Sequence, residues 1–363
     1  MKKLVLMAIP LSLSFLVANE KQNFQDVYPT IKEDMNKSIL KKSAIKKFVI
    51  SKDPILLGSV DTSVYAKNIV LSRDEKVAFI ADSRSGLQIA DISDSKKAKI
   101  ISSVATSDSA LDLVLSNDNL TVFIADQNAG VQIVDVSDVL NPKLIASIPT
   151  LGSAKSIVIS KDNNSIFVAD DSYGIQVINV SDIYSPKIIA HLNLSGVAED
   201  ITLSDDGKYA YIANGIEGIK VIDIQNPATP RVIASLDMTS HAVGVTLSHD
   251  NKRLFVANYE EGVQIVNVSY ALSPIIIASI KTPSHALSVT LLDNGKEALI
   301  ADEKSGMQIV DIKNIYKPKI VAKLDTKSQA QSITLTEDNR KVLIADGWSG
   351  VHIADISSHV ILR

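Results

Sequence analysis

Residues 126–148, DQNAGVQIVDVSDVLNPKLIASI, return in altered form as residues 302–324, DEKSGMQIVDIKNIYKPKIVAKL. Both stretches belong to an array in which a glycine recurs every 44 residues, at Gly86, Gly130, Gly174, Gly218, Gly262, Gly306 and Gly350. No insertion or deletion interrupts this interval. A fixed period long enough for several short strands indicates a closed ring or a stacked array of similar units.

Each repeat contains four runs of residues that favour β-strands. In one repeat the runs are Lys187–Leu192, Asp200–Leu203, Tyr209–Ala213 and Ile219–Ile224, which are rich in β-branched residues or alternate in polarity. A proline precedes the first run here and in most other repeats. Because proline cannot donate to a strand ladder, we expect the first run at the outer edge of its sheet and the second run towards the centre.

This organisation predicts an all-β fold. Seven repeats of four antiparallel strands make a seven-bladed β-propeller. An open solenoid is the alternative, but it needs atypical polar repeats that cap its ends, and the sequence has none.

The two ends of the array are expected to close the ring together. Residues 55–60 (ILLGSV) match the outer run and precede the first complete repeat, whereas residues 351–356 (VHIADI) end the last repeat. We therefore predict that the amino-terminal strand completes the last blade. A truncated run at residues 360–362 (VIL) could compete for the same edge, but it is shorter and lacks the entry that Pro54 provides.

Several segments resemble a known repeat. Residues 87–94 (LQIADISD), 131–138 (VQIVDVSD) and 307–312 (MQIVDI) are similar to the LVIVD repeat of exported bacterial and archaeal proteins, and residues 142–147 (PKLIAS) fit the same pattern. The resemblance covers about residues 54–356, and YVTN-type surface-layer propellers are more distantly similar. It implies a propeller and an exported location, and it implies neither a catalytic motif nor an agreed activity.

The amino terminus has the composition of a targeting segment. Lys2 and Lys3 precede the apolar run of residues 4–18 (LVLMAIPLSLSFLVA), so residues 1–18 are predicted to be a cleaved secretory signal peptide. A membrane anchor is the alternative, although Pro10, Ser12 and Ser14 interrupt the run.

A polar segment separates this signal from the repeats. Residues 19–53 are predicted to contain a short helix over residues 30–42, or a flexible tether there, and an extra strand over residues 44–51. The propeller itself is predicted to span residues 54–363.

Composition restricts the partners and the chemistry. The chain has no cysteine, which excludes disulfides, thiol catalysis and thiolate metal sites. Its formal net charge is −4 and it has no basic stripe, so nucleic acid is not an expected partner. We expect a periplasmic, secreted or cell-surface monomer without a transmembrane span after the signal is cleaved.

An aspartate or asparagine stands four residues before each repeat glycine, at Asp82, Asp126, Asp170, Asn214, Asn258, Asp302 and Asp346. A ring of metal ligands is conceivable, but a neutral amide replaces the carboxylate twice. A residue that caps its turn needs only an acceptor oxygen, so the pattern favours turn capping.

Residues just ahead of the second run offer one candidate metal site. His241 and His285 occupy equivalent positions in adjacent repeats, and with Asp200 they could bind a divalent metal, since imidazole and carboxylate suit transition ions. Simple duplication of an exposed loop histidine is the stronger interpretation. We therefore predict no cofactor, with a divalent metal as the alternative.

The hairpin tips between the third and fourth runs differ in every repeat, while the strands are nearly identical. The tips are Arg84, Asn128, Ser172, Ile216, Glu260, Lys304 and Trp348. Tyr173 and Tyr259 stand beside this series. A rigid scaffold that presents a variable surface has this pattern, and the candidate binding residues are therefore Trp348, Tyr173, Tyr259, Arg84, Glu260 and Lys304.

Two hypotheses of function follow. The first is a non-enzymatic exported scaffold that binds a protein, peptide or glycan through its loops, with no catalytic residues. The second is a propeller hydrolase, such as a lactonase-like enzyme, with a polar or metal site at the channel mouth. No linear catalytic motif distinguishes them, because a propeller site is assembled from single residues on different blades.

Overall fold

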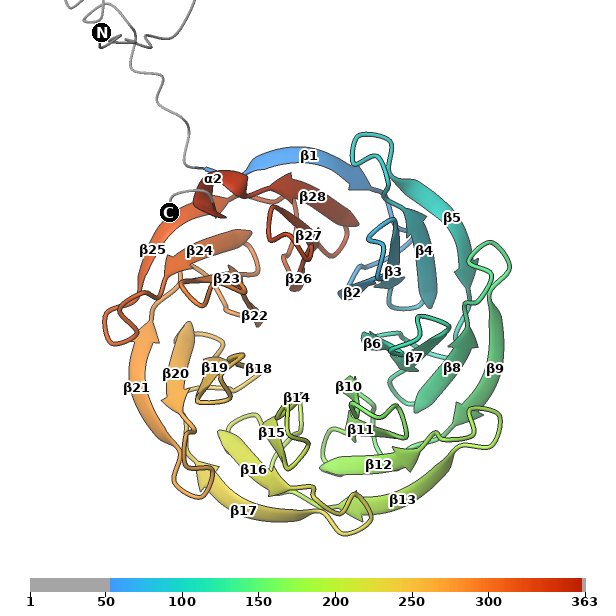
Figure 1. Cartoon of the computed structure of the whole chain (residues 1–363), viewed down its shortest axis with the longest axis horizontal. Helices are drawn as coiled ribbons and strands as arrows, with labels where there is room; N and C mark the ends of the chain where they lie inside the picture. Colours follow the sequence, from blue (N-terminus) through green and yellow to red (C-terminus); the bar gives the residue numbers. More distant parts are fainter. Residues whose placement is uncertain (1–52, 361–363) are drawn as a thin grey trace, which may run out of the picture. The chain divides into compact units, whose positions relative to one another are not determined.

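The computed structural model describes residues 53–360 of the chain (Figure 1). These residues are almost entirely β-strands and turns, and they end in a short helix, α2 (Ser357–Val360). Within this range no helix is long and apolar enough to cross a membrane. The predicted signal peptide and the helix and strand predicted before residue 53 lie outside the described residues.

Seven sheets of four antiparallel strands form the blades of a propeller. Blade 1 contains β2 (Asn68–Leu71), β3 (Val77–Ala81), β4 (Leu87–Asp91) and β5 (Lys99–Val104). Blade 2 contains β6 (Asp112–Leu115), β7 (Thr121–Ala125), β8 (Val131–Asp135) and β9 (Lys143–Ile148). Blade 3 contains β10 (Ser156–Ile159), β11 (Ser165–Ala169), β12 (Ile175–Asn179) and β13 (Lys187–Leu192).

The remaining blades repeat this arrangement. Blade 4 contains β14 (Asp200–Leu203), β15 (Tyr209–Ala213), β16 (Ile219–Asp223) and β17 (Arg231–Leu236). Blade 5 contains β18 (Gly244–Leu247), β19 (Arg253–Ala257), β20 (Val263–Asn267) and β21 (Ile275–Ile280). Blade 6 contains β22 (Ser288–Leu291), β23 (Glu297–Ala301), β24 (Met307–Asp311) and β25 (Lys319–Leu324). Blade 7 contains β26 (Ser332–Leu335), β27 (Lys341–Ala345), β28 (Val351–Asp355) and β1 (Ile55–Val60).

We name the strands of a blade a, b, c and d from the centre of the ring outwards. The proline-marked run forms the outer strand d of each blade and the run before the hairpin turn forms the inner strand a, as predicted. The predicted boundaries hold closely, and β16 ends at Asp223, one residue before the predicted end. The predicted all-β, seven-bladed propeller is therefore confirmed.

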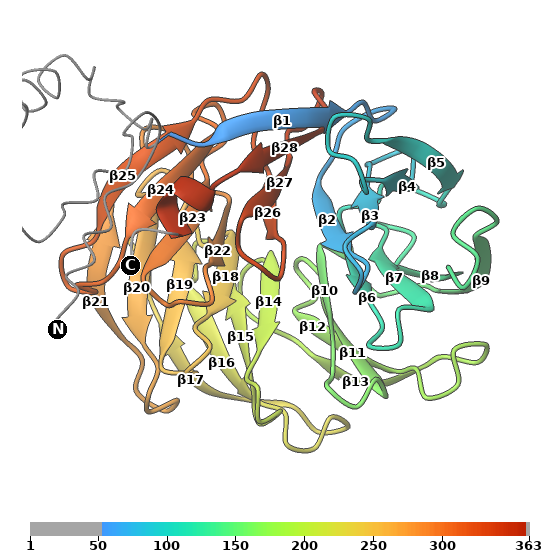
Figure 2. The same ribbon diagram turned by 45° about the horizontal axis from the view of Figure 1, so that its top comes forward.

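The ring closes through the two ends of the described chain. Strand β1 pairs antiparallel with β28, with Ile55 opposite Asp355 and Val60 opposite Val351. The two strands lie side by side in both views (Figures 1 and 2). The prediction that residues 55–60 complete the last blade is confirmed. Val360, the first residue of the competing run, lies in α2 instead.

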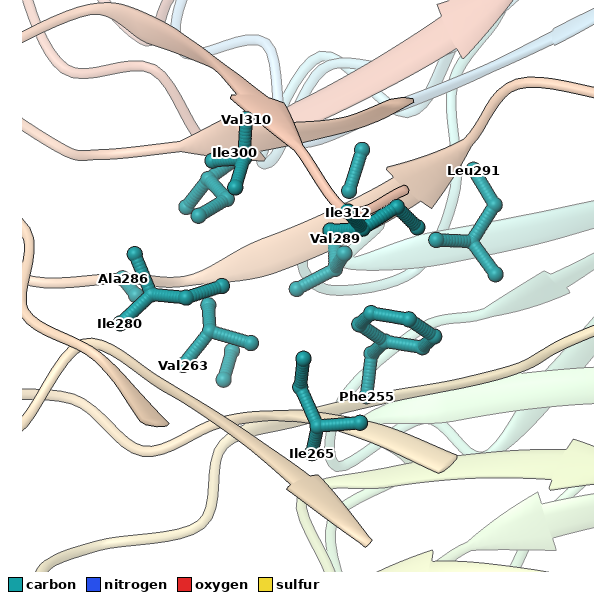
Figure 3. Packing of buried hydrophobic residues seen from close by; sticks show 12 residues of the cluster. Phe255, Val263, Ile265, Ile280, Ala286, Val289, Leu291, Ile300, Val310 and Ile312 are labelled. Carbon is teal, nitrogen blue, oxygen red and sulfur yellow. The ribbon is translucent and has the colours of Figure 1, made fainter. Parts of the chain in front are cut away.

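The hydrophobic core lies between blades. One cluster contains Phe255, Val263 and Ile265 of blade 5 together with Val289 and Leu291 of blade 6. Figure 3 shows the Phe255 ring directed towards the blade 6 residues. Because each cluster is shared by two neighbouring blades, no blade buries its apolar face alone.

A backbone bridge also joins each pair of blades. The crossover from strand d to strand a of the next blade carries a fully buried alanine at Ala66, Ala110, Ala154, Ala198, Ala242, Ala286 and Ala330. Ala110 illustrates the bridge: its N–H donates to the Ser83 carbonyl over 3.0 Å, and it accepts from the Ser83 N–H over 3.1 Å. Two backbones approach closely here, which explains the small side chain at every crossover.

The aspartate or asparagine at the start of each b–c hairpin acts on a different loop from the one predicted. The carboxylate of Asp126 accepts the N–H groups of Ser107 and Asp108 at 2.9 and 3.0 Å and the Thr106 hydroxyl at 2.7 Å, all in the crossover that enters its blade. At Asn214 the amide donates instead, to the carbonyl of Ser195. The prediction that this residue caps its own turn is wrong, because the side chain turns inward and holds the preceding crossover.

The repeat glycines are required by both conformation and space. Gly218 has a φ of +72°, and a Cβ atom there would lie 2.2 Å from the carbonyl oxygen of Leu236. Gly207, in the a–b turn of the same blade, has a similar φ of +66° but no atom within 4 Å of such a Cβ. The two glycines therefore separate backbone strain from steric exclusion.

We expect Gly207→Ala to cost about 1–3 kcal/mol through left-handed backbone strain alone. Gly218→Ala adds a collision with backbone, and it should lower the melting temperature clearly further than Gly207→Ala does. Thermal unfolding of both variants, followed by circular dichroism, measures the difference. Equal losses would show that the close approach of Leu236 is not a constraint.

Candidate functional site

The b–c hairpins and the d–a crossovers meet at one face of the ring, which we call the loop face. Their contact is fixed by the backbone bridges between blades, such as Ser83 with Ala110. All candidate hairpin-tip residues lie on this face.

Two of the predicted binding residues line a common cleft. It lies between blade 7 and blade 1, an interface that we call the seam, and its volume is about 390 Å³. Trp348 comes from the blade 7 hairpin and Arg84 from the blade 1 hairpin, and the other lining residues are Val64, Tyr65, Lys67, Ser83 and Ser109. We call this the seam cleft.

An aromatic pair forms one wall of the seam cleft. The Trp348 and Tyr65 rings meet edge to face, with centroids 5.1 Å apart and an interplanar angle of 88°. Tyr65 orients the indole, yet 72% of Trp348 remains exposed. This geometry is favourable for aromatic pairs and leaves the indole available to a ligand.

The local sequence makes room for Tyr65. Residue 347 bridges to Ala66 and is a glycine with a φ of +54°. A Cβ atom there would lie 2.8 Å from the Tyr65 ring. The crossover that carries Tyr65 is held by Asp82, whose carboxylate accepts the N–H groups of Ser63 and Val64 at 2.9 and 3.0 Å.

Lys67 lies deeper in the seam cleft. Its Nζ donates to the side-chain oxygen of Gln331 over 3.0 Å and lies 4.7 Å from the centre of the Tyr65 ring. Burial lowers the pKa of Lys67, and the positive charge of Lys155 lowers it further. No carboxylate of residues 53–360 lies within ion-pair distance of Lys67.

A chain of polar side chains leads from Tyr65 to His285. The Tyr65 hydroxyl donates to Gln329, whose amide donates to Glu303 over 3.0 Å. The other Glu303 oxygen lies 2.6 Å from Nδ1 of His285, and the His285 ring stacks on Tyr259 with centroids 4.1 Å apart. Burial raises the pKa of Tyr65, and Glu303 and Asp346 add to the rise.

His241 belongs to a separate group of charges. Its Nε2 lies 3.8 Å from Glu199, and Lys155 pairs with the same carboxylate at 3.2 Å and with Asp171 at 3.6 Å. Glycine again makes room for the ring, because Gly215 stands beside His241 as Gly347 stands beside Tyr65.

Asp200 faces the inner strands of the ring rather than the histidines. Its carboxylate accepts the Ser156 hydroxyl at 2.7 Å and the Val245 N–H of the next blade at 2.8 Å. Burial raises the pKa of Asp200 to about 6, with a further contribution from the charge of Asp112. Asp112 makes the equivalent contact to the Ile157 N–H over 2.9 Å.

The three predicted metal ligands are therefore not assembled. His241 lies beside Glu199 and His285 beside Glu303, whereas Asp200 hydrogen-bonds to the inner strand of the next blade. Among the side chains of residues 53–358, no group of three or more His, Cys, Asp or Glu could hold a metal ion.

The other predicted binding residues lie on the hairpins of blades 3, 5 and 6, with Tyr259 and Glu260 on the same hairpin. The backbone carbonyl of Tyr173 lies 2.8 Å from Nε2 of His191, and the Glu260 carbonyl accepts from Lys281 over 2.5 Å. The ring of Tyr259 is covered by the stacked ring of His285. Lys304 is the tip of the blade 6 hairpin. These residues do not line the seam cleft.

Tyr65 and Lys67 were missing from the predicted set of binding residues. The 44-residue register places both just ahead of a strand a, but only closure of the ring brings them beside Trp348. Ring closure was predicted from the sequence, and placing the first crossover beside the last hairpin on that basis would have identified both residues.

Comparison with known proteins agrees with the fold. The family model described as "LVIVD repeat" matches residues 65–106, 109–150, 195–238 and 292–326. Among solved structures, the chain is similar to the Pseudomonas aeruginosa periplasmic gluconolactonase PpgL, with a TM-score of 0.66 and 15% identity over 76% of this chain and 97% of that chain. At this identity the likeness shows the fold alone. No curated protein matches the chain.

The buried carboxyl of Asp200 predicts a specific pH dependence. Its pKa in the folded protein, about 6, lies above the ordinary value of 3.8, so the folded protein binds this proton more tightly than the unfolded chain does. The stability that this group contributes is greatest below about pH 4 and is lost as the pH rises to about 6. Asparagine does not titrate, so the melting temperature of Asp200→Asn relative to wild type should rise over this range and then level off.

Asp206→Asn is the matched control. The pKa of Asp206 is lowered, chiefly by the hydrogen bond from Lys208, so its contribution has the opposite sign. The melting temperature of this variant relative to wild type should fall as the pH rises. A flat difference for Asp200→Asn across the series would contradict the assigned environment of that carboxyl.

Proposed function

We propose that this chain, an LVIVD-repeat protein, is an exported, non-enzymatic scaffold that binds a protein, peptide or glycan through its loop face, with the seam cleft as its anchoring site. The repeat, found in exported proteins, and the signal-like residues 1–18 support a periplasmic or cell-surface location. The observation that carries the binding proposal is the Tyr65–Trp348 pair.

This pair has the features of a binding anchor. Aromatic residues dominate the energetics of interfaces when they occupy a defined position and become desolvated on binding. Trp348 is positioned by Tyr65, whose backbone and side chain are in turn held by Asp82 and Gln329. The indole is therefore preorganised, which lowers the entropy cost of binding.

The rest of the fold supports recognition rather than chemistry. Strands and blade interfaces repeat almost unchanged, whereas the hairpin tips vary from blade to blade. Such a division supplies a rigid support and a variable surface.

Trp348→Ala should weaken capture of the ligand by roughly 2 kcal/mol, the usual scale for an aromatic anchor, while the melting temperature stays nearly unchanged. Ile216→Ala is the matched control, because Ile216 occupies the same hairpin position in blade 4 and is 74% exposed. Purified wild type and both variants are compared by affinity capture from a periplasmic extract and on a glycan array. Binding that survives Trp348→Ala would contradict the seam cleft as the anchor.

One observation favours a second candidate, a lactonase-like hydrolase. The carboxylate of Glu303 fixes Nδ1 of His285 as the protonated nitrogen, and no group of residues 53–360 hydrogen-bonds to Nε2. Such a histidine can act as a general base towards water. One solved structure with a similar fold is a periplasmic gluconolactonase, which makes a sugar lactone the substrate to test.

We expect the purified protein to leave the hydrolysis of glucono-δ-lactone, followed by pH-stat titration, at the uncatalysed rate. His285→Ala and Glu303→Gln should then match wild type. An acceleration by wild type that both variants lose would replace the scaffold with the enzyme.

A further inference from the structure

We propose that the ligand of the seam cleft is an acidic sugar, whose ring lies on Trp348 and whose carboxylate is held by Lys67 and Arg84. This inference rests on the proposed function and names the ligand class for the same site. Three features of the cleft carry it: its cations, its aromatic wall and its size.

The cations of the seam cleft lack protein counter-ions. Lys67 is half-buried, donates to the neutral Gln331 and has an aromatic ring as its other neighbour. Arg84 is exposed, and within residues 53–360 it takes part in no ion pair. A charge withdrawn from water without a partner is costly, so an anionic ligand would stabilise Lys67 in its protonated form.

The acidic groups nearest to this wall are already engaged. The carboxylate of Asp346 accepts the N–H groups of Lys327 and Ser328 at 3.0 and 2.9 Å and lies 3.1 Å from His352. Glu303 is held by His285 and Gln329. No acidic side chain lines the cleft itself.

The shape of the seam cleft suits a small ring. A volume of about 390 Å³ is at the lower end of the range for small-molecule sites. The exposed indole offers an apolar surface to the C–H face of a pyranose, and the Ser83 and Ser109 side chains line the cleft where sugar hydroxyls would lie. An acidic peptide shares the charge but lacks a pyranose C–H face for the indole, so an acidic sugar is the better match to both the cations and the aromatic wall.

The combination is specific to the seam. The interface between blades 5 and 6 also pairs two rings, Tyr259 and His285. Its hairpin tip is Glu260, and Glu303 lies 2.6 Å from His285, so this interface carries acidic side chains at the positions that correspond to the cations of the seam. Among the described blade interfaces, an aromatic pair and cations without a carboxylate partner coincide at the seam.

The test compares an acidic sugar with its methyl ester, in which each negatively charged carboxylate becomes a neutral ester. Tri-galacturonate and its methyl ester are titrated into the purified protein, and binding is followed by tryptophan fluorescence and calorimetry. Trp348 is the single tryptophan of the chain, so its emission reports on the cleft directly. We expect saturable binding of the acid, with an affinity at least tenfold higher than that of the ester. The affinity for the acid should fall in 0.5 M salt, because salt screens the attraction between its carboxylates and the two cations.

Variants identify the groups that hold the carboxylate. Lys67→Gln and Arg84→Gln should each weaken binding of tri-galacturonate about tenfold and leave binding of the ester unchanged. Lys304→Gln is the matched control, since it removes the same charge from the equivalent hairpin tip of blade 6. It should leave both ligands unaffected.

Each other outcome overturns the inference in a recognisable way. Equal affinity for acid and ester, lost in Trp348→Ala, removes the anion and keeps the anchoring cleft. Tighter binding of tri-aspartate than of tri-galacturonate makes the occupant an acidic peptide. No saturable change with any of the three ligands overturns the acidic-sugar class, whereas the proposed function stands or fails separately on the Trp348-dependent capture.

Discussion

The antiparallel ladder between β1 and β28 is the contact on which the rest of this molecule depends. It supplies the fourth strand of blade 7, and it brings the crossover that follows β1 against the hairpin that precedes β28. Without it, blade 7 would end in an open strand edge, and the apolar face between blades 7 and 1 would meet water. Closure thus stabilises the ring and also creates the contact between Tyr65 and Trp348.

Much of this architecture could be predicted from a single sequence, because a period of fixed length carries topological information. Pro54 and its equivalents mark the outer strand, and the turn residues mark the hairpins, so the strand order follows from local chemistry. The role of Asp126 could not be predicted in the same way. Its carboxylate turns away from its own hairpin to the crossover some 20 residues earlier, and only the packed blade shows which unpaired N–H groups lie there.

The candidate site shows the same limit. Trp348 and Arg84 were recognised as variable hairpin tips, but Tyr65 and Lys67 gain their significance only from neighbours at the far end of the chain. The predicted grouping of His241, His285 and Asp200 failed for a related reason. Each has a closer partner: His241 has Glu199, His285 has Glu303, and Asp200 has the Val245 N–H. The linear register does not show these contacts.

The joining of the first and last strands also orders events during biogenesis. Ile55 is synthesised long before its partner Asp355. Strand β1 therefore stays unpaired until the whole ring has been synthesised. Contacts of such large separation form slowly, since the chain must first lose the entropy of a long loop. The ring therefore stays open until the carboxyl end of the chain has been made. Until then, β1 is exposed to pairing with other nascent chains.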